Sequence, residues 1–363
     1  MSSETELSKK VKSMALALGA DLVGICAARA TPESRQLGSW LARGYAGTMD
    51  YLARTAEKRQ DPEKLFEGAQ SMIVIGMTYD PAPAPGAGEP DLPAQPDDAR
   101  GRVARYAVGD DYHEVLADRL HALAAGIEAL VEAPVSSRVY VDTGPVIERV
   151  AAAYAGIGWV GKNTCLIHPE LGSYLFLGVL VTDLQLDFDV QTEDLCGTCT
   201  ACLDACPTDA LESPRVLNAT RCISYTTIED PGPIPEALRR AHGDLVYGCD
   251  ICQEVCPWNS RRARSWPDDP LGLHARLEAR DEWASPSLAW ILDLDEAAWQ
   301  RATRASAMRR SKRRGLLRNA LVAAGNSQDP SLRPQVERLA AGDDPLLAEH
   351  ARWAIEQWNG TGA

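Results

Sequence analysis

The sequence lacks the long apolar segments of a protein that spans a membrane. No apolar run reaches the roughly 20 residues that a membrane-spanning helix needs. The first ten residues contain neither an apolar signal core nor an Arg-Arg export motif. These absences predict a cytoplasmic protein with no membrane partner, in a compartment that keeps cysteine thiols reduced.

Positive charge is also scarce, since 37 Lys and Arg residues stand against 51 Asp and Glu residues and give a net charge of −14. Such an average argues against a nucleic-acid partner. One stretch is an exception because it holds eight basic residues and no acid: Arg301, Arg304, Arg309, Arg310, Lys312, Arg313, Arg314 and Arg318. Exposed helices usually mix both signs. The stretch is therefore either a solvated helix face or a surface for a polyanion.

Cysteine, by contrast, is concentrated in one segment, because eight of the ten cysteines lie between residues 196 and 256. The first run has the spacing C-x2-C-x2-C-x3-C-P and consists of Cys196, Cys199, Cys202 and Cys206. In bacterial ferredoxins three cysteines of such a run bind one [4Fe-4S] cluster and the fourth binds a second cluster. The second run consists of Cys249, Cys252 and Cys256, and Val246 stands where its first cysteine is expected. The isolated Cys222 can replace that missing ligand.

The crossover of ferredoxin ligands then assigns all eight thiolates to two sites. One predicted site comprises Cys196, Cys199, Cys202 and Cys256. The other comprises Cys206, Cys222, Cys249 and Cys252. Zinc is the alternative, because C-x2-C pairs also bind zinc. Two runs that each end in Cys-Pro favour two [4Fe-4S] clusters over zinc or disulfides.

At 363 residues the chain is expected to form two or three domains. Residues 1–187 alternate predicted helices and strands and are expected to form an α/β domain. Residues 188–262 hold the cysteines and are expected to form a ferredoxin-like module. Residues 263–363 are expected to be helical, and segments 318–325 and 352–359 align as in HEAT-like repeats. Strands are predicted at 21–27, 71–77, 137–142 and 174–181, helices at 5–19, 32–43, 111–132 and 146–155, and a long loop at 80–100.

Asp142 is a candidate functional residue because of its position in the chain. It ends a predicted strand just before a helix in which Pro145 is expected to occupy the first turn. Loops at such positions expose functional side chains. The alternative is that Asp142 caps the helix.

Several segments outside the cysteine runs resemble the epoxyqueuosine reductase family. They are Val141–Arg149, Ala155–Asn163, Arg221–Ser224, Tyr247–Cys252, Ala307–Arg310 and Leu317–Ala320. With the cysteine module, the resemblance extends from about residue 5 to residue 358. It implies reduction of epoxyqueuosine to queuosine at the wobble position of the tRNA anticodon. It also implies that residues 1–187 form an α/β cobalamin-binding domain related to that of reductive dehalogenases.

The resemblance further implies an electron path and a cofactor site. Electrons from a low-potential donor of the flavodoxin or ferredoxin type would pass through two [4Fe-4S] clusters to a cobalamin that attacks the epoxide, with Asp142 as proton donor. We hypothesise that apolar surroundings and the corrin raise the pKa of Asp142 so that it can donate. The implied cobalamin-binding residues are Arg59, Arg105, Asp142, Lys162, Ser224, Gly248 and Asp250. Ser224 and Asp250 flank cluster ligands and could contact their sulfurs instead. No DxHxxG cobalamin motif is present, because Asp111-Tyr-His113 is followed by Glu-Val-Leu; cobalamin is expected from the resemblance alone.

For tRNA, the resemblance favours the polyanion interpretation of the basic stretch. The expected contacts are Arg149, Arg309, Arg310, Lys312, Arg313, Arg314 and Arg318. A monomer is expected because no interface pattern stands out. Two alternatives remain. A corrinoid reductive dehalogenase acting on a small molecule leaves the basic stretch unexplained, and a two-cluster electron carrier leaves residues 1–185 without a role.

Overall fold

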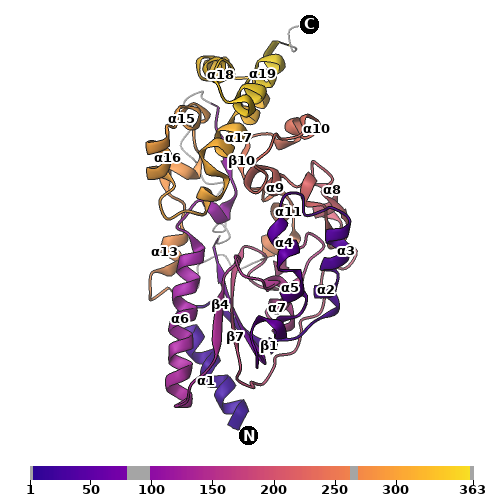
Figure 1. Cartoon of the computed structure of the whole chain (residues 1–363), viewed down its shortest axis with the longest axis vertical. Coiled ribbons are helices and arrows are strands. Elements are labelled where there is room, and N and C mark those ends of the chain that lie inside the picture. Colours follow the sequence, from indigo (N-terminus) through magenta and orange to yellow (C-terminus); the bar gives the residue numbers. More distant parts are fainter. Residues whose placement is uncertain (1–2, 80–98, 262–268, 360–363) are drawn as a thin grey trace.

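In the computed structural model, the described part of the chain comprises residues 3–79, 99–261 and 269–359. The loop predicted at 80–100 falls almost entirely outside this part. Helices α1 (Ser3–Ala17) and α19 (Pro345–Asn359) lie at opposite ends of the longest axis (Figure 1). Within the described ranges, none of the helices combines the length and the apolar character needed to cross a membrane.

The N-terminal half is built on a four-stranded sheet with the order β1-β2-β7-β4. Its strands are β1 (Leu22–Ala27), β2 (Ser71–Thr78), β7 (Leu175–Thr182) and β4 (Ser137–Tyr140). All four were predicted to within one or two residues. Every residue of β2 is buried, because helices cover both faces of the sheet. The predicted α/β core is present, and its neighbouring strands are all antiparallel.

Two hydrophobic clusters flank this sheet. On one face α1 and the long helix α6 (Tyr112–Val131) pack against apolar residues such as Ile73 and Leu180. On the other face the short helix α7 (Glu148–Tyr154) packs against residues such as Val74 and Val179. At Gly24 of β1 an added Cβ would lie 2.0 Å from the Ala155 carbonyl oxygen, so this glycine permits the close contact at the end of α7.

The two other predicted helices of this half differ from expectation. The helix predicted at 32–43 is divided into α2 (Pro32–Arg35) and α3 (Leu37–Ala42). The helix predicted from 146 begins at Glu148, so the placement of Pro145 in its first turn was wrong. The remaining elements are α4 (Asp50–Arg54), α5 (Ala56–Gln60), η1 (Pro62–Leu65), β3 (Arg102–Val103), η2 (Arg105–Ala107), β5 (Trp159–Val160) and β6 (Leu166–Ile167).

The cysteine-rich segment consists of short elements. They are α8 (Ala201–Asp204), β8 (Leu211–Ser213), β9 (Val216–Leu217), η3 (Ala219–Arg221), α9 (Ile223–Ile228), α10 (Glu236–Arg239), η4 (Arg240–His242), β10 (Leu245–Tyr247), α11 (Ile251–Glu254) and α12 (Pro257–Arg261). Strand β10 pairs in parallel with β3, which ties this segment to the N-terminal half.

The C-terminal segment is helical, as predicted. Its elements are α13 (Leu273–Leu277), α14 (Asp281–Ala284), α15 (Leu288–Asp293), α16 (Glu296–Ala302), η5 (Ala307–Ser311), α17 (Lys312–Ser327), η6 (Pro330–Leu332), α18 (Arg333–Ala340) and α19. Helix α17 packs against α19, where Trp358 Nε1 donates to the Ala324 carbonyl at 3.1 Å. These helices share one core with Val103 and Val246. The HEAT-like repeat and the domain boundaries stay predictions.

Candidate active site

A cavity of about 810 Å³ lies where the three parts of the chain meet. The N-terminal half contributes residues from segments 37–59, 106–113 and 142–149. The cysteine-rich segment contributes residues from 217–229 and Tyr247, and the C-terminal segment contributes Ala307 and Arg310. This volume is typical of small-molecule and cofactor sites.

Asp142 lies in this cavity on a loop that follows β4. Its backbone has a φ of 55°, a conformation that is uncommon for residues other than glycine. The Asp142 N–H donates to Glu148 Oε1 at 2.5 Å and so holds the loop against the start of α7. The Asp142 side chain is 65% exposed and faces the cavity. The alternative that Asp142 caps a helix is wrong, because the N-cap of α7 is Ile147.

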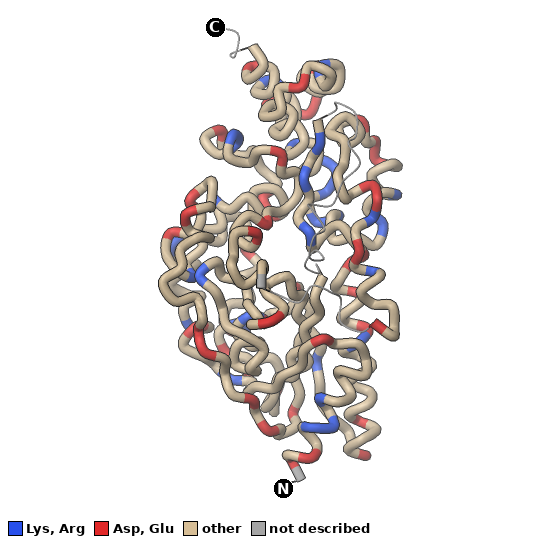
Figure 2. Tube along the Cα trace, turned by 180° about the vertical axis from the view of Figure 1, so that it is seen from behind, with Lys and Arg blue, Asp and Glu red and all other residues tan. Residues whose placement is uncertain are grey.

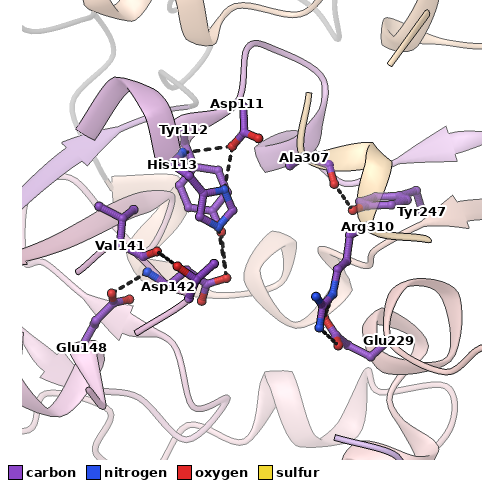
Figure 3. Close-up of polar contacts among 11 residues, drawn as sticks. Asp111, Tyr112, His113, Val141, Asp142, Glu148, Glu229, Tyr247, Ala307 and Arg310 are labelled. Atoms are coloured by element: carbon purple, nitrogen blue, oxygen red, sulfur yellow. Dashed lines mark hydrogen bonds and ion pairs between the residues drawn. The ribbon is translucent and has the colours of Figure 1, made fainter. Parts of the chain in front are cut away.

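Two side chains from the start of α6 contact the Asp142 carboxylate. Tyr112 Oη donates to Asp142 Oδ2 at 3.1 Å, and His113 Nε2 lies 3.5 Å from the same oxygen (Figure 3). On its other side His113 Nδ1 lies 2.6 Å from Asp111 Oδ1. The Tyr112 ring is stacked between His113 and Phe176 of β7, with centroid distances of 4.1 and 4.2 Å. The imidazole is therefore fixed between two carboxylates.

This arrangement shifts the pKa values of His113, Asp142 and Glu148. Burial acts to lower the pKa of His113, but Asp111 and Asp142 outweigh it and raise that pKa to about 9. The protein that encloses the cavity acts to raise the pKa of Asp142, but the charge and contact of His113 and the hydrogen bond from Tyr112 lower it overall. The raised Asp142 pKa that we hypothesise beside a corrin stays a prediction. Burial, together with the charge of Asp142, raises the pKa of Glu148 to about 8.

The wall opposite Asp142 contains an ion pair. Arg310 Nε and Nη2 donate to the two carboxylate oxygens of Glu229 at 3.0 and 2.7 Å (Figure 3). The Arg310 guanidinium also lies 5.7 Å from the ring centroid of Tyr51. Beside it, Tyr247 Oη donates to the Ala307 carbonyl at 2.6 Å. This wall can therefore offer cationic, anionic and aromatic groups to a ligand.

Three of the predicted site residues line the cavity besides Arg310, namely Arg59, Asp142 and Arg149. Arg59 Nη1 donates to the Val146 carbonyl at 3.1 Å, and Arg149 Nη1 donates to the Thr164 carbonyl at 2.7 Å. Both guanidinium groups thus stabilise the segments on either side of the Asp142 loop.

The other predicted cofactor residues lie outside the set that lines the cavity. The Arg105 N–H donates to Asp250 Oδ2 at 2.7 Å, and the Gly248 N–H donates to Thr227 Oγ1 at 3.0 Å. Lys162 Nζ donates to the carbonyls of Gly197 and Cys199 at 2.7 and 2.8 Å, so it contacts the cysteine loop.

The Ser224 side chain hydrogen-bonds the Cys222 thiol. This contact supports the alternative that Ser224 touches a ligand sulfur.

The cysteines form the two predicted groups. Cys196, Cys199, Cys202 and Cys256 line one small cavity. In the other group, burial and, to a smaller extent, the nearby Cys222 raise the pKa of Cys249 to about 12. The pKa of Cys222 is raised by burial and, to a smaller extent, by Cys206. All ten cysteines are free thiols. Within the described ranges no three ligand-type side chains could share one metal ion, whereas in a [4Fe-4S] cluster each cysteine binds a different iron.

The basic stretch is paired with partners from elsewhere in the chain. Arg309 donates to Gln300 Oε1 at 2.7 Å, Arg313 to the Leu294 carbonyl at 2.7 Å, and Arg314 to Asp344 at 2.6 and 2.7 Å. Lys312 lines an open groove together with Arg313 and Arg314. Figure 2 shows basic and acidic segments interspersed along the trace. The stretch is acid-free in sequence but not in space.

Arg318 requires a correction, because only 1% of it is exposed. Its guanidinium donates to the carbonyls of Thr226, Asp230 and Gly232. Burial lowers its pKa to about 10. The structure contradicts the assignment of Arg318 to tRNA, because the side chain cannot reach a phosphate.

Four residues that line the cavity were not predicted as site residues: His113, Tyr112, Glu148 and Glu229. His113 was considered only as part of a cobalamin motif that is absent. The sequence contains a signal for His113. The chain has only six histidines, and this one follows Asp111 by two residues at a predicted helix start, where a carboxylate can bind an imidazole.

Comparison with known proteins agrees with this geometry. A family model described as "Epoxyqueuosine reductase QueG, DUF1730" matches residues 59–143, and one described as "4Fe-4S double cluster binding domain" matches residues 195–259. The chain is 38% identical over 354 residues to an epoxyqueuosine reductase of Xanthomonas campestris pv. campestris, which covers 97% of this chain and 96% of the relative.

Solved structures give the same result. The chain matches a crystal structure of epoxyqueuosine reductase with a tRNA-Tyr epoxyqueuosine-modified stem loop at 32% identity and a TM-score of 0.86, over 97% of this chain and 90% of that one. It matches the epoxyqueuosine reductase of Bacillus subtilis, solved with its catalytic aspartate loop swung out of the active site, at 31% identity and a TM-score of 0.85, with the same coverage. The chain therefore belongs to the epoxyqueuosine reductase family.

Proposed function

We propose that this protein reduces epoxyqueuosine in the anticodon of tRNA to queuosine. The observation that carries the proposal is the Asp142 carboxylate, which faces a cavity of about 810 Å³ and is held beside His113. A relative of the same fold has been crystallised with an epoxyqueuosine-modified tRNA stem loop. A flipped nucleotide from a single-stranded loop can enter such a cavity, whereas a paired base cannot.

The proposed cofactors are two [4Fe-4S] clusters and a cobalamin. The eight cysteines form two groups of four free thiols, as two clusters require. The cavity is of a suitable size for part of a large cofactor and carries the aromatic rings of Trp40, Tyr51 and Tyr106. Cobalamin would supply a metal centre that collects two electrons and attacks carbon. The proposed binding residues are Arg59, which lines the cavity, and Arg105, Ser224, Gly248 and Asp250, which lie outside its lining.

Lys162 fits this cofactor role less well than the others. Its ammonium group is bound by two carbonyls of the first cysteine loop, 2.7 and 2.8 Å away. We assign it to that loop, where a positive charge stabilises a cluster that gains electrons.

In the proposed reaction the carbon–oxygen bonds of the epoxide break and an alkene forms. The balance is two electrons and two protons in, with alkene and water as products. Asp142 passes a proton to the departing oxygen, because an alkoxide is a poor leaving group unless it is protonated. Tyr112 orients the carboxylate through its hydrogen bond to Oδ2.

The proposed tRNA contacts are the exposed cations near the cavity. Arg149 and Arg310 line it, Arg309 directly precedes Arg310, and Lys312, Arg313 and Arg314 line a separate groove of the C-terminal segment. Phosphate contacts of this kind make affinity fall as salt is added. The proposal includes a donor of the flavodoxin or ferredoxin type, a cytoplasmic setting and a monomeric enzyme.

The test is conversion of epoxyqueuosine-containing tRNA by the holoenzyme, followed by nucleoside mass spectrometry. We expect queuosine from the wild type and at least a hundredfold slower conversion by Asp142→Asn, with unchanged iron and cobalamin content. The matched control is Asp343→Asn on the exposed surface, which should convert at the wild-type rate. An active Asp142→Asn variant would remove the carboxylate from the mechanism, and an inactive wild type would overturn the proposed function.

A further inference from the structure

We propose that His113, held by Asp111, is the proton store that reloads Asp142, so that one carboxylate can deliver both protons of the deoxygenation. This inference rests on the proposed function and adds residues to its site. Asp142 would contact the departing oxygen, whereas His113 would act through Asp142 and is a positioning and proton-supplying residue.

The geometry of the imidazole supports this role. His113 Nδ1 is bound to Asp111 Oδ1 at 2.6 Å, whereas its buried Nε2 faces the Asp142 carboxylate. The Asp142 Oδ2 atom lies 3.5 Å from this Nε2, slightly beyond hydrogen-bond distance. Catalytic hydrogen bonds are often long in the unliganded state and shorten when substrate binds. A small movement of the Asp142 loop would therefore complete a path from His113 to the cavity.

The stoichiometry of the reaction gives such a store a role. The first proton converts the alkoxide into a hydroxyl, and the second allows that hydroxyl to leave as water. A single carboxylic acid holds only one proton, so it must be reprotonated between the two steps. In the proposed sequence the His113 N–H proton passes to Asp142, Asp142 passes it to the oxygen, and His113 regains a proton from water.

The electrostatics of the site point in the same direction. The pKa of Asp142 is lowered, so near neutral pH its carboxyl group is ionised and cannot itself be the reservoir. The pKa of His113 is about 9, because Asp111 and Asp142 stabilise the imidazolium against the effect of burial. The proton is therefore held by His113, and Asp142 lies between His113 and the departing oxygen of the substrate.

Other groups that face this pair come from several elements. Glu148 on α7 is close enough for its pKa to be affected by both Asp142 and His113, and Arg149 beside it stabilises the Asp142 carboxylate. The charge of Asp142 also acts to raise the pKa of five groups on other elements, namely Tyr51, Arg59, Tyr106, Tyr112 and Arg310. Among these groups His113 is the base that contacts the carboxylate and gains a proton below pH 9.

The first test is direct and independent of activity. The full chain labelled with ¹³C-histidine is titrated by NMR, and His113→Gln identifies the resonance. We expect His113 to titrate near pH 9 in the wild type, and its pKa to fall towards the ordinary 6.5 in Asp111→Asn. A wild-type His113 that titrates near 6.5 would overturn the inference whether or not any variant folds.

The second test is the pH profile of single-turnover queuosine formation by pre-reduced holoenzyme. We expect wild-type rates to stay level up to about pH 9 and to fall above it. His113→Gln should be about a hundredfold slower at pH 8, should gain rate as the pH falls, and should be partly rescued by added imidazole. Asp111→Asn should move the alkaline limb to lower pH.

The outcomes separate the two proposals. If Asp142→Asn is inactive while His113→Gln keeps the wild-type rate and pH profile, the proposed function stands and this inference fails. If the wild type forms no queuosine, the proposed function fails, while the NMR titration still decides whether His113 stores a proton.

Discussion

Arg310 and Glu229 are 81 residues apart in the sequence, yet they form a two-point ion pair on the cavity wall opposite Asp142. The hydrogen bond to Glu229 raises the pKa of Arg310 and keeps it charged. The pair joins the cysteine-rich segment, which supplies Glu229, to the C-terminal segment, which supplies Arg310.

The pair predicts opposite effects of its two members on tRNA binding. Glu229→Gln should strengthen binding because it removes an anion beside the proposed contact. Arg310→Ala should weaken binding. It should also make the slope of log binding constant against log salt concentration shallower by about one unit, as the loss of one phosphate contact requires. Titrations of tRNA at several salt concentrations measure both. Glu337→Gln at the exposed Arg333–Glu337 pair, which lies outside the proposed tRNA contacts, is the matched control. Equal salt slopes for Arg310→Ala and the wild type would show that Arg310 does not contact phosphate.

Cys222 is predicted to complete the second cluster in place of the missing motif cysteine. Cys222→Ser should lose one of the two clusters, which would halve the iron content and leave the electron paramagnetic resonance signal of the first cluster. Cys26→Ser is the matched control because Cys26 lies in β1, where its thiol donates to the Ala151 carbonyl and contacts no predicted ligand, and it should retain both clusters. Full iron content in Cys222→Ser would contradict the ligand assignment.

Trp159 is predicted to tune the first cluster, because its Nε1 donates to Cys196 Sγ at 3.4 Å. A hydrogen bond to a ligand sulfur stabilises the more negative, reduced cluster and so raises its potential. Trp159→Phe should therefore lower the midpoint potential of this cluster in a redox titration. Trp299→Phe in α16 is the control, since Trp299 Nε1 has no hydrogen-bond partner within the described ranges. A midpoint potential that does not move would rule out this role.

His350 predicts how stability responds to acid. It is fully buried in α19, where Nδ1 lies 2.7 Å from the Leu346 carbonyl and Nε2 accepts from the Ile234 N–H. Burial lowers its pKa to about 4. Because the folded pKa lies below the unfolded value near 6.5, the neutral imidazole stabilises the fold above pH 6.5, and this stability is lost as the pH falls through 4. The loss amounts to roughly 3 kcal/mol.

Urea unfolding at several pH values measures this effect. The difference in the free energy of unfolding between the wild type and His350→Gln should be greatest above pH 6.5 and should shrink towards pH 4. A difference that stays constant across this range would contradict the assignment to His350.

Local sequence patterns predicted much of the architecture. The strands β2 and β7 are continuous apolar runs, and the cysteine spacing alone predicted the double-cluster domain that the family comparison confirms. Both signals arise within short segments, where neighbours in sequence are neighbours in space. The antiparallel pairing of the sheet was not predictable in this way, because it depends on how the loops cross the sheet.

The candidate site was predicted only in part for the same reason. Asp142 was identified by its position after a strand, but its partner His113 comes from a different element. Arg318 belongs to a charged run in sequence, and its burial follows from helix α17 packing against residues 226–232. Contacts between distant segments therefore determine both the charge state of Asp142 and the burial of Arg318.

The central claim is that Asp142 meets the departing oxygen inside this cavity. It is tested most directly by the structure of holo Asp142→Asn bound to an epoxyqueuosine-modified anticodon stem loop. We expect the epoxide oxygen within about 2.6–3.2 Å of the side chain at position 142, with the base between it and the Arg310 wall. An epoxide bound elsewhere, out of reach of residue 142, would contradict the account.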